Sequence, residues 1–145
     1  LQQNKEGLRS ALKVAIGLLS VYVLAGLLGE KEFDAETLLF QISMPGLDEE
    51  VMCRGVMLGL MCSTLREGGK PSLNPAIIIN GIWFGLVHSL AFQNGEVVFS
   101  VASFIVTGLV GYALAYIALR SRSILIPMLT HNLCNFCNNL LSMIL

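Results

Sequence analysis

Two histidines and a pair of adjacent glutamates are the residues of this chain best suited to chemistry. His88 and His131 are the only histidines among 145 residues, and Glu49 and Glu50 are neighbours. An imidazole or a carboxylate can take a proton from a bound water and return it, as acid–base catalysis requires. All four residues lie in or beside long apolar segments, where polar groups are costly and usually serve a function.

The acidic motif contains one carboxylate with an evident partner and one without. Asp48 is a good helix N-cap, and Glu50 and Arg54 are four residues apart, so their side chains can pair on one helical face. Glu49 is turned about 100° from that face and has no partner within its own helix. We therefore expect Glu49 to be the free carboxylate, although helix capping and pairing alone also explain most of the motif.

Each histidine has a companion one helical turn away. Phe84 precedes His88 by four residues, and Asn135 follows His131 by four. The side chains of His131 and Asn135 would project toward the same point and could hold one oxygen atom. Hydrogen bonding between helices explains either motif taken singly. Taken with Glu49, the motifs predict one shared site, because short connections can bring their helices together.

The elements that must position these residues are membrane helices. The chain is 54% hydrophobic and 13% charged, with a mean hydropathy of +0.71, whereas soluble domains carry about 25% charged residues. The apolar stretches are also too long for a small soluble protein. We expect an all-α, polytopic transmembrane bundle of about five helices, forming a single membrane-embedded domain over residues 1–145. The expected spans are Leu8–Gly29, Glu49–Leu65, Asn74–Phe92, Val97–Leu119 and Ser123–Leu145.

The connections between these spans are expected to be short or irregular. An interfacial stretch is expected before the second span, and Pro45 with Gly46 is expected to break the chain. The residues of the stretch are Leu38, Leu39, Phe40 and Ile42. The connections Glu67–Leu73 and Gln93–Glu96 contain Gly or Pro and predict tight antiparallel neighbours. Small residues at four-residue spacing predict helices that pack closely. The two pairs are Gly55/Gly59 and Gly81/Gly85.

The basic residues predict an orientation in the membrane. If the five spans alternate in direction, Lys31 is the only basic residue on one side of the membrane. Arg54 lies inside a helix, and the other basic residues lie on the opposite side of the membrane. The positive-inside rule then makes the N-terminus cytoplasmic. A net charge of −1 gives no reason to expect nucleic acid as a partner. The residues that share one side are Lys5, Arg9, Lys13, Arg66, Lys70, Arg120 and Arg122.

The three motifs in this order resemble those of a known family, the CAAX prenyl protease and bacteriocin-processing (CPBP, Abi) family of intramembrane endopeptidases. The series is Glu-Glu-x-x-x-Arg, Phe-x-x-x-His and His-x-x-x-Asn, and the likeness covers about residues 45–138. Family members usually carry more helices around this core, so we expect that N-terminal helices of a longer parent are missing here. The orientation given above places Glu49 and both histidines toward the external half of the membrane, whereas CAAX processing would need access from the cytosol. This favours a multi-pass protein of a bacterial cell membrane.

The resemblance implies a role for each motif residue. Glu49 would activate a water that hydrolyses a peptide bond, with His88 helping to orient it. His131 and Asn135 would form an oxyanion hole for the tetrahedral intermediate. No cofactor is expected, and the implied partners are membrane lipids and a peptide or lipidated-peptide substrate. The supporting residues are Glu50, Arg54 and Phe84.

Other functions remain open at this stage. A zinc ion held by His88, His131 and Glu49 could carry out the same hydrolysis. The chain could instead be a non-enzymatic immunity or scaffold protein with the same fold, or it could relay protons or ions through the same residues. Nothing in the sequence predicts the oligomeric state.

Overall fold

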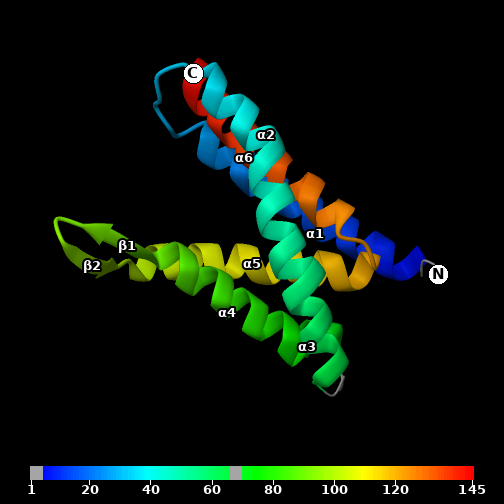
Figure 1. Ribbon diagram of the computed structural model, residues 1–145. Helices are drawn as coiled ribbons and strands as arrows, with labels where there is room; N and C mark the ends of the chain where they lie inside the picture. Colours follow the sequence, from blue (N-terminus) through cyan, green and yellow to red (C-terminus); the bar gives the residue numbers. More distant parts are fainter. Residues whose placement is uncertain (1–4, 66–69) are drawn as a thin grey trace.

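The computed structural model describes residues 5–65 and 70–145, so Arg66 and part of the connection Glu67–Leu73 lie outside the described residues. A π-helical segment, Val51–Met57, joins α2 to α3 without interruption, and the three form one long rod (Figure 1). A short 3-10 turn, Pro71–Leu73, precedes α4. The helices are α1 (Lys5–Gly26), α2 (Ala35–Glu50), α3 (Leu58–Thr64), α4 (Pro75–Ser89), α5 (Val101–Ser121) and α6 (Leu125–Ile144).

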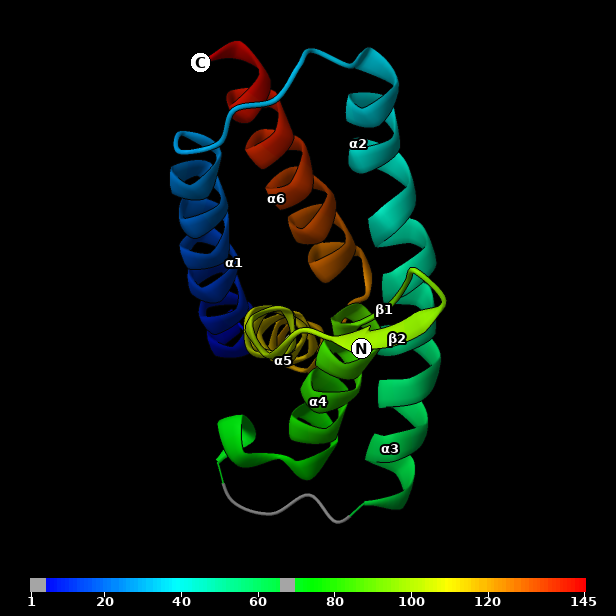
Figure 2. The ribbon, with the colours of Figure 1, turned by 90° about the vertical axis from the view of Figure 1, so that its left-hand side faces the viewer.

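The helices pack as two crossing groups. Helices α4 and α5 lie side by side, and α6 lies between α1 and α2 (Figures 1 and 2). One small apolar cluster joins α3, α4 and α5, and a second joins α1 to α5. The buried members of the first are Leu58, Ala76, Ile77, Ala115 and Ala118, and those of the second are Ala11, Val110, Leu114 and Ile117.

Two helices of the described chain are long and apolar enough to cross a membrane. These are α1 and α5, while α4 is apolar but shorter. Helix α1 leaves large apolar side chains uncovered, with Ile16 at 64% exposure and Leu24 at 61%. Exposed apolar surface of this extent is what a lipid-facing helix presents and a soluble protein avoids.

The prediction that Pro45 and Gly46 break the chain was wrong. Helix α2 continues through both residues, so the expected span Glu49–Leu65 is the second half of a longer rod, and the expected interfacial stretch before it is also helical. A proline inside a helix disturbs the backbone hydrogen bonds around it. The Asn132 side chain adds hydrogen bonds on both sides of the proline: its Oδ1 accepts from the Gly46 N–H at 2.7 Å, and its Nδ2 donates to the Ser43 carbonyl at 3.3 Å.

The expectation of an all-α fold was wrong at one place. Helix α4 ends at Ser89, and strands β1 (Leu90–Gln93) and β2 (Glu96–Phe99) form an antiparallel hairpin before α5 begins. The third and fourth expected spans are therefore shorter at this end. Asn94 and Gly95 form the turn, with φ of 53° and 87°. Positive φ at both turn positions suits the twist of a two-residue hairpin, and Asn-Gly adopts it readily.

The glycine pairs behave differently from each other. A Cβ at Gly85 would lie 2.7 Å from the carbonyl oxygen of Phe104, and one at Gly81 would lie 2.9 Å from the Cβ of Tyr112, also on α5. The predicted close packing of α4 is therefore confirmed. At Gly59 a Cβ would meet nothing within 4 Å, and at Gly55 only a backbone oxygen of its own helix at 4.0 Å. The close packing predicted for that pair was wrong.

Candidate active site

The two adjacent glutamates end α2 at the point where the π-helical segment begins. Glu50 is fully buried, with 0% of its surface exposed. The side chain of Glu49 is 33% exposed. Successive residues of a helix point about 100° apart, so the same turn sends one carboxylate into the protein and the other toward its surface.

Glu50 is held by two buried cationic or polar partners. Its Oε1 accepts from Arg54 Nη1 at 3.0 Å and from His131 Nδ1 at 2.8 Å. The other terminal nitrogen of Arg54 donates to the Gly111 carbonyl at 3.0 Å. The expected pair of Glu50 and Arg54 is present, whereas the contact with His131 was not predicted. This network ties α2, the π-helical segment, α5 and α6 together.

The ring of Phe84 lies at the centre of the motif residues. It stacks on the His88 ring with centroids 4.2 Å apart, and the Arg54 guanidinium lies 4.5 Å from its centroid. The His131 ring meets it edge-on at 6.1 Å. Phe84 can lie this close to α5 because Gly111 faces it: a Cβ there would be 2.6 Å from the Cβ of Phe84. The sequence predicted only the contact with His88.

Glu49 and His88 face each other at the edge of a pocket. Their Oε2 and Nε2 atoms are 3.6 Å apart, and each side chain is 33% exposed. His88 Nδ1 lies 2.9 Å from the Phe84 carbonyl oxygen. Because a carbonyl can only accept, Nδ1 carries the proton and Nε2 is left to face Glu49. The pocket, of about 450 Å³, is lined by Asp48, Glu49, Met52, Cys53, Trp83, Phe84, Val87 and His88.

The predicted oxyanion residues are only partly joined to this group. His131 is reached through Glu50 and Phe84, as described above. Asn135 is half-buried one turn farther along α6, and its side chain makes no hydrogen bond within the part of the chain that the structure describes. The fold thus brings Glu49, His88 and His131 into one neighbourhood and leaves the Asn135 amide without a partner there.

Comparison with known proteins identifies the family. A model described as "Type II CAAX prenyl endopeptidase Rce1-like" matches residues 32–137, well over half of the chain. The chain belongs to the Rce1-like family. The match begins just before α2 and includes every motif residue, so the predicted resemblance is confirmed. Rce1-like proteins are membrane proteins and hydrolases of the endopeptidase class. No curated protein and no solved structure matches the chain.

The zinc alternative can be tested against the side chains of this Rce1-like site. Both histidines direct Nδ1 at an oxygen, on the Phe84 carbonyl and on Glu50, and Nε2 of His88 faces Glu49. Metal-ligating histidines are commonly oriented in this way. However, no three His, Cys, Asp or Glu side chains are grouped to hold a metal within residues 5–65 and 70–145. We therefore derive no catalytic step through a metal.

Asn132 is a residue that the sequence motifs did not single out. It is buried in α6 and bonds the backbone of α2 one turn before the two glutamates. A Cβ at Gly46 would lie 2.5 Å from Asn132 Oδ1 and 2.6 Å from the Met128 carbonyl oxygen. Only glycine lets α2 approach α6 so closely. The signal in the sequence was a polar residue in an apolar helix beside His131, together with a proline inside an α-helix.

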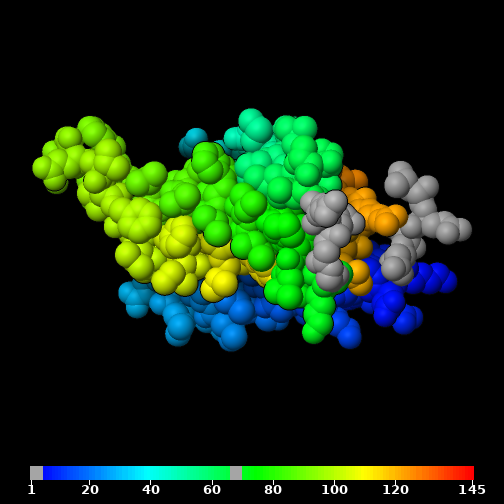
Figure 3. Space-filling model, turned by 90° about the horizontal axis from the view of Figure 1, so that it is seen from below, coloured from blue at the N-terminus to red at the C-terminus, as the bar shows by residue number. Residues whose placement is uncertain are grey.

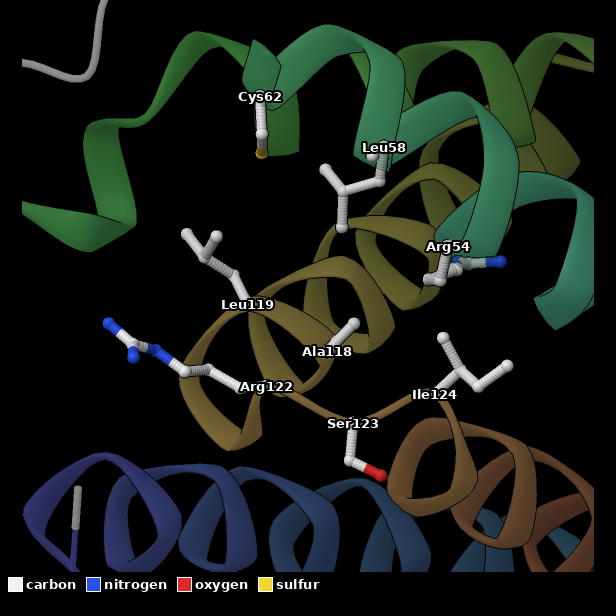
Figure 4. A pocket seen from close by; sticks show the side chains of 9 residues that line it. Arg54, Leu58, Cys62, Ala118, Leu119, Arg122, Ser123 and Ile124 are labelled. Carbon is white, nitrogen blue, oxygen red and sulfur yellow. The ribbon is translucent and has the colours of Figure 1, made fainter. Parts of the chain in front are cut away.

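A second pocket of the Rce1-like chain, about 260 Å³, lies between the rod and the junction of α5 with α6 (Figure 4). Its two arginines do not converge. Figure 4 shows the guanidinium groups of Arg54 and Arg122 pointing away from each other. The remaining lining is largely apolar, so this pocket gathers no charge. Its lining residues are Arg54, Leu58, Gly59, Cys62, Ala118, Leu119, Arg122, Ser123 and Ile124.

Proposed function

We propose that this Rce1-like protein is an intramembrane endopeptidase in which Glu49 activates the water that hydrolyses a peptide bond. The observation that carries the proposal is the pair of Glu49 and His88, 3.6 Å apart and both partly exposed, beside a pocket of about 450 Å³. Glu50, by contrast, is committed to buried partners. Membership of an endopeptidase family supplies the reaction class.

In this mechanism the Glu49 carboxylate takes a proton from water as the water oxygen adds to the scissile carbonyl carbon. The carbon–nitrogen bond then breaks, and the leaving amine receives that proton from Glu49. His88 orients the water through Nε2. The 3.6 Å between Glu49 Oε2 and His88 Nε2 exceeds a direct hydrogen bond. Glu49 Oε2 is also buried without a hydrogen-bond partner in the described residues, which a water held between the two groups would supply.

His131 and Asn135 would stabilise the negative oxygen of the tetrahedral intermediate. His131 already uses Nδ1 on Glu50, so it would donate from Nε2 in its doubly protonated form. The Asn135 amide has no competing hydrogen bond in the described residues, which supports a role as the second donor. One such donor accelerates acyl transfer by about 10²–10³.

We further propose that the chain forms one membrane-embedded domain with five membrane helices: α1, the rod, α4, α5 and α6. The apolar side chains exposed along α1 support this arrangement. The charge of the connections supports a cytoplasmic N-terminus, and the proposed host membrane is a bacterial cell membrane. The rod carries its buried charges, Glu50 and Arg54, as a pair, as a polar group inside a membrane requires.

The substrate is proposed to be an apolar peptide or a lipidated peptide. A further pocket of about 600 Å³ adjoins the site and shares Asp48 and Met52 with it. Its other lining residues are apolar, and methionine adapts to irregular apolar ligands. They are Met44, Leu47, Val51 and Val56.

The test is cleavage by the purified protein in lipid vesicles. Two probes are needed: a peptide ending in a prenylated CAAX sequence and a pool of unmodified apolar peptides, with products identified by mass spectrometry. Glu49→Gln protein, prepared identically, controls for contaminating proteases. Cleavage by the wild type alone supports the proposal, and no cleavage of either probe overturns it. Loss of cleavage with a chelator, restored by zinc, would favour the zinc alternative.

A further inference from the structure

The β-hairpin begins two residues after His88 and projects from the helices. Figures 1 and 3 show it extending beyond the ends of α4 and α5, and all of its strand residues are exposed. Two hydrogen bonds fix its base. The Ser100 N–H donates to the Ser89 carbonyl at 2.9 Å, and the Ser103 hydroxyl donates to the His88 carbonyl at 2.9 Å. The hairpin is thus anchored at the histidine of the proposed site.

The register of the hairpin determines which backbone groups face outward. Residue pairs in an antiparallel hairpin alternate between hydrogen-bonded and non-hydrogen-bonded pairs. The pair at the base, Ser89 with Ser100, is hydrogen-bonded. The pairs Leu90↔Phe99 and Phe92↔Val97 are therefore non-hydrogen-bonded. The N–H and C=O groups of Leu90 and Phe92 point away from β2 along one edge. Those of Val97 and Phe99 point away from β1 along the other.

The edge of β1 continues directly from the wall of the site pocket. Val87 and His88 line that pocket, and β1 starts at Leu90. An unpaired strand edge is a template for an extended peptide, whose backbone supplies the missing hydrogen bonds. We propose that the substrate peptide binds as a third strand along β1 and so enters the pocket beside Glu49. This inference rests on the proposed function, because the peptide is the substrate of that reaction.

The dimensions fit such a mode of binding. A strand advances about 3.3 Å per residue, and β1 starts two residues after His88, so a peptide paired with Leu90 would reach His88 within a few residues of the paired segment. Main-chain pairing of this kind holds a peptide with little dependence on its side chains. Selectivity would then come from the apolar pockets beside Asp48 and Met52.

A lipid surface is the other candidate for the hairpin, because the side chains of both non-hydrogen-bonded pairs share one apolar face. A peptide is favoured for two reasons. An unpaired edge is costly in lipid, where nothing replaces the missing hydrogen bonds. The edge also adjoins the pocket, whereas the turn at Asn94 and Gly95 lies at the far end.

Amide hydrogen exchange tests the proposal directly. The experiment uses Glu49→Gln protein in lipid nanodiscs, with and without a prenylated CAAX peptide and, separately, the unmodified pool. Bound peptide is expected to slow exchange at the amides of Leu90 and Phe92 by at least tenfold. Exchange at Val97 and Phe99 should be unchanged. Bound peptide without slowing at Leu90 and Phe92, or no binding of either probe, overturns the proposal.

A matched pair of proline variants tests the edge of β1 against the edge of β2. Phe92→Pro and Val97→Pro each remove one outward N–H and one side chain of the same apolar face. We expect Phe92→Pro to weaken peptide binding about tenfold, as the loss of one hydrogen bond predicts, and Val97→Pro to leave it unchanged. Phe92→Leu, which keeps the N–H, should bind normally. An equal loss of peptide binding in both proline variants would show that the apolar face of the hairpin matters and the edge of β1 does not. That result would overturn the proposal.

These results are distinguishable from failure of the proposed function. If the wild type cleaves a probe but the amides of Leu90 and Phe92 are not protected, the function stands and the binding mode fails. If the probe protects those amides in Glu49→Gln protein but the wild type does not cleave it, the binding mode stands and the function fails.

Discussion

Glu49 and Glu50 are neighbours in the chain but have opposite surroundings. Glu50 is fully buried and shares one oxygen between Arg54 and His131, at 3.0 and 2.8 Å. Glu49 is partly exposed and faces His88 at 3.6 Å. The difference follows from the turn of a helix, which separates successive side chains by about 100°.

The contrast shows how one short motif can supply both structure and chemistry. A buried carboxylate with strong partners is expensive to unpair, so it suits the holding of helices in place. A carboxylate with a weak partner beside a pocket can gain and lose a proton, which a general base must do. The loss of Glu50 should therefore change folding, whereas the loss of Glu49 should change cleavage.

The largest expected effect is the loss of the buried ion pair. Arg54→Met leaves the Glu50 carboxylate without its cationic partner, and it should lower the free energy of unfolding by about 3–5 kcal/mol. Thermal unfolding of the purified protein in detergent measures this. The double variant Glu50→Leu/Arg54→Met removes both charges and should recover part of the loss. If Arg54→Met were as stable as the wild type, Glu50 would have no structural role through this pair.

The next effect concerns the chemistry alone. Asn135→Ala should reduce the cleavage rate by about 10²–10³, because one oxyanion donor is lost, and should leave thermal unfolding nearly unchanged. Asn138→Ala, three residues along the same helix, removes the bond to the Tyr22 carbonyl and serves as a control that should retain cleavage. Equal rates in Asn135→Ala and the wild type would remove Asn135 from the site.

A smaller effect is expected where α2 meets α6. Gly46→Ala would place a Cβ 2.5 Å from Asn132 Oδ1 and push the two helices apart, at a cost of about 1–3 kcal/mol in the free energy of unfolding. Gly59→Ala is the matched control, since its Cβ would meet nothing within 4 Å. Because alanine has a better helix propensity than glycine, this substitution should stabilise the protein slightly. Chemical denaturation in detergent measures the free energy of unfolding of both variants. Equal stability would show that α2 does not need this close approach.

The smallest effect lies at the start of the helix that carries both glutamates. Asp34 caps α2, accepting from the Thr37 hydroxyl and the Glu36 N–H, and these bonds lower the pKa of Asp34. Its contribution is present above the ordinary pKa of aspartate and is lost as the pH falls through the lower folded value. Asp34→Ala should therefore be less stable than the wild type at neutral pH, with a difference that shrinks in acid. The free energy of unfolding of both proteins should be measured across pH. A difference between them that stayed constant in acid would contradict this prediction.

The sequence predicted the family better than the path of the chain around the motif residues. The three motifs identified the family, because order and spacing are visible in the sequence alone. The pairing of Glu50 with Arg54 was also predictable, since it depends only on helical spacing. The bond from His131 to Glu50 spans 81 residues and depends on how α6 packs, so no local pattern reveals it.

The predictions about the path of the chain that were wrong have local physical causes. Pro45 and Gly46 were expected to end a helix, but Asn132 supplies hydrogen bonds from another helix and lets α2 continue. Asn94-Gly95 between apolar residues is a strong hairpin signal, and it was hidden by the high hydropathy of the neighbouring spans. The glycine pairs show that small residues permit close packing without requiring it: Gly81 and Gly85 meet α5, and Gly59 meets nothing.

The central claim is tested most directly by comparing Glu49→Gln with Glu50→Gln, measuring peptide cleavage and thermal unfolding for both. The account predicts that Glu49→Gln unfolds within about 0.5 kcal/mol of the wild type and loses cleavage by about 10²–10⁴. Glu50→Gln should be clearly less stable, because Arg54 keeps its buried charge without a carboxylate. Cleavage by Glu49→Gln at a rate near that of the wild type would contradict the account.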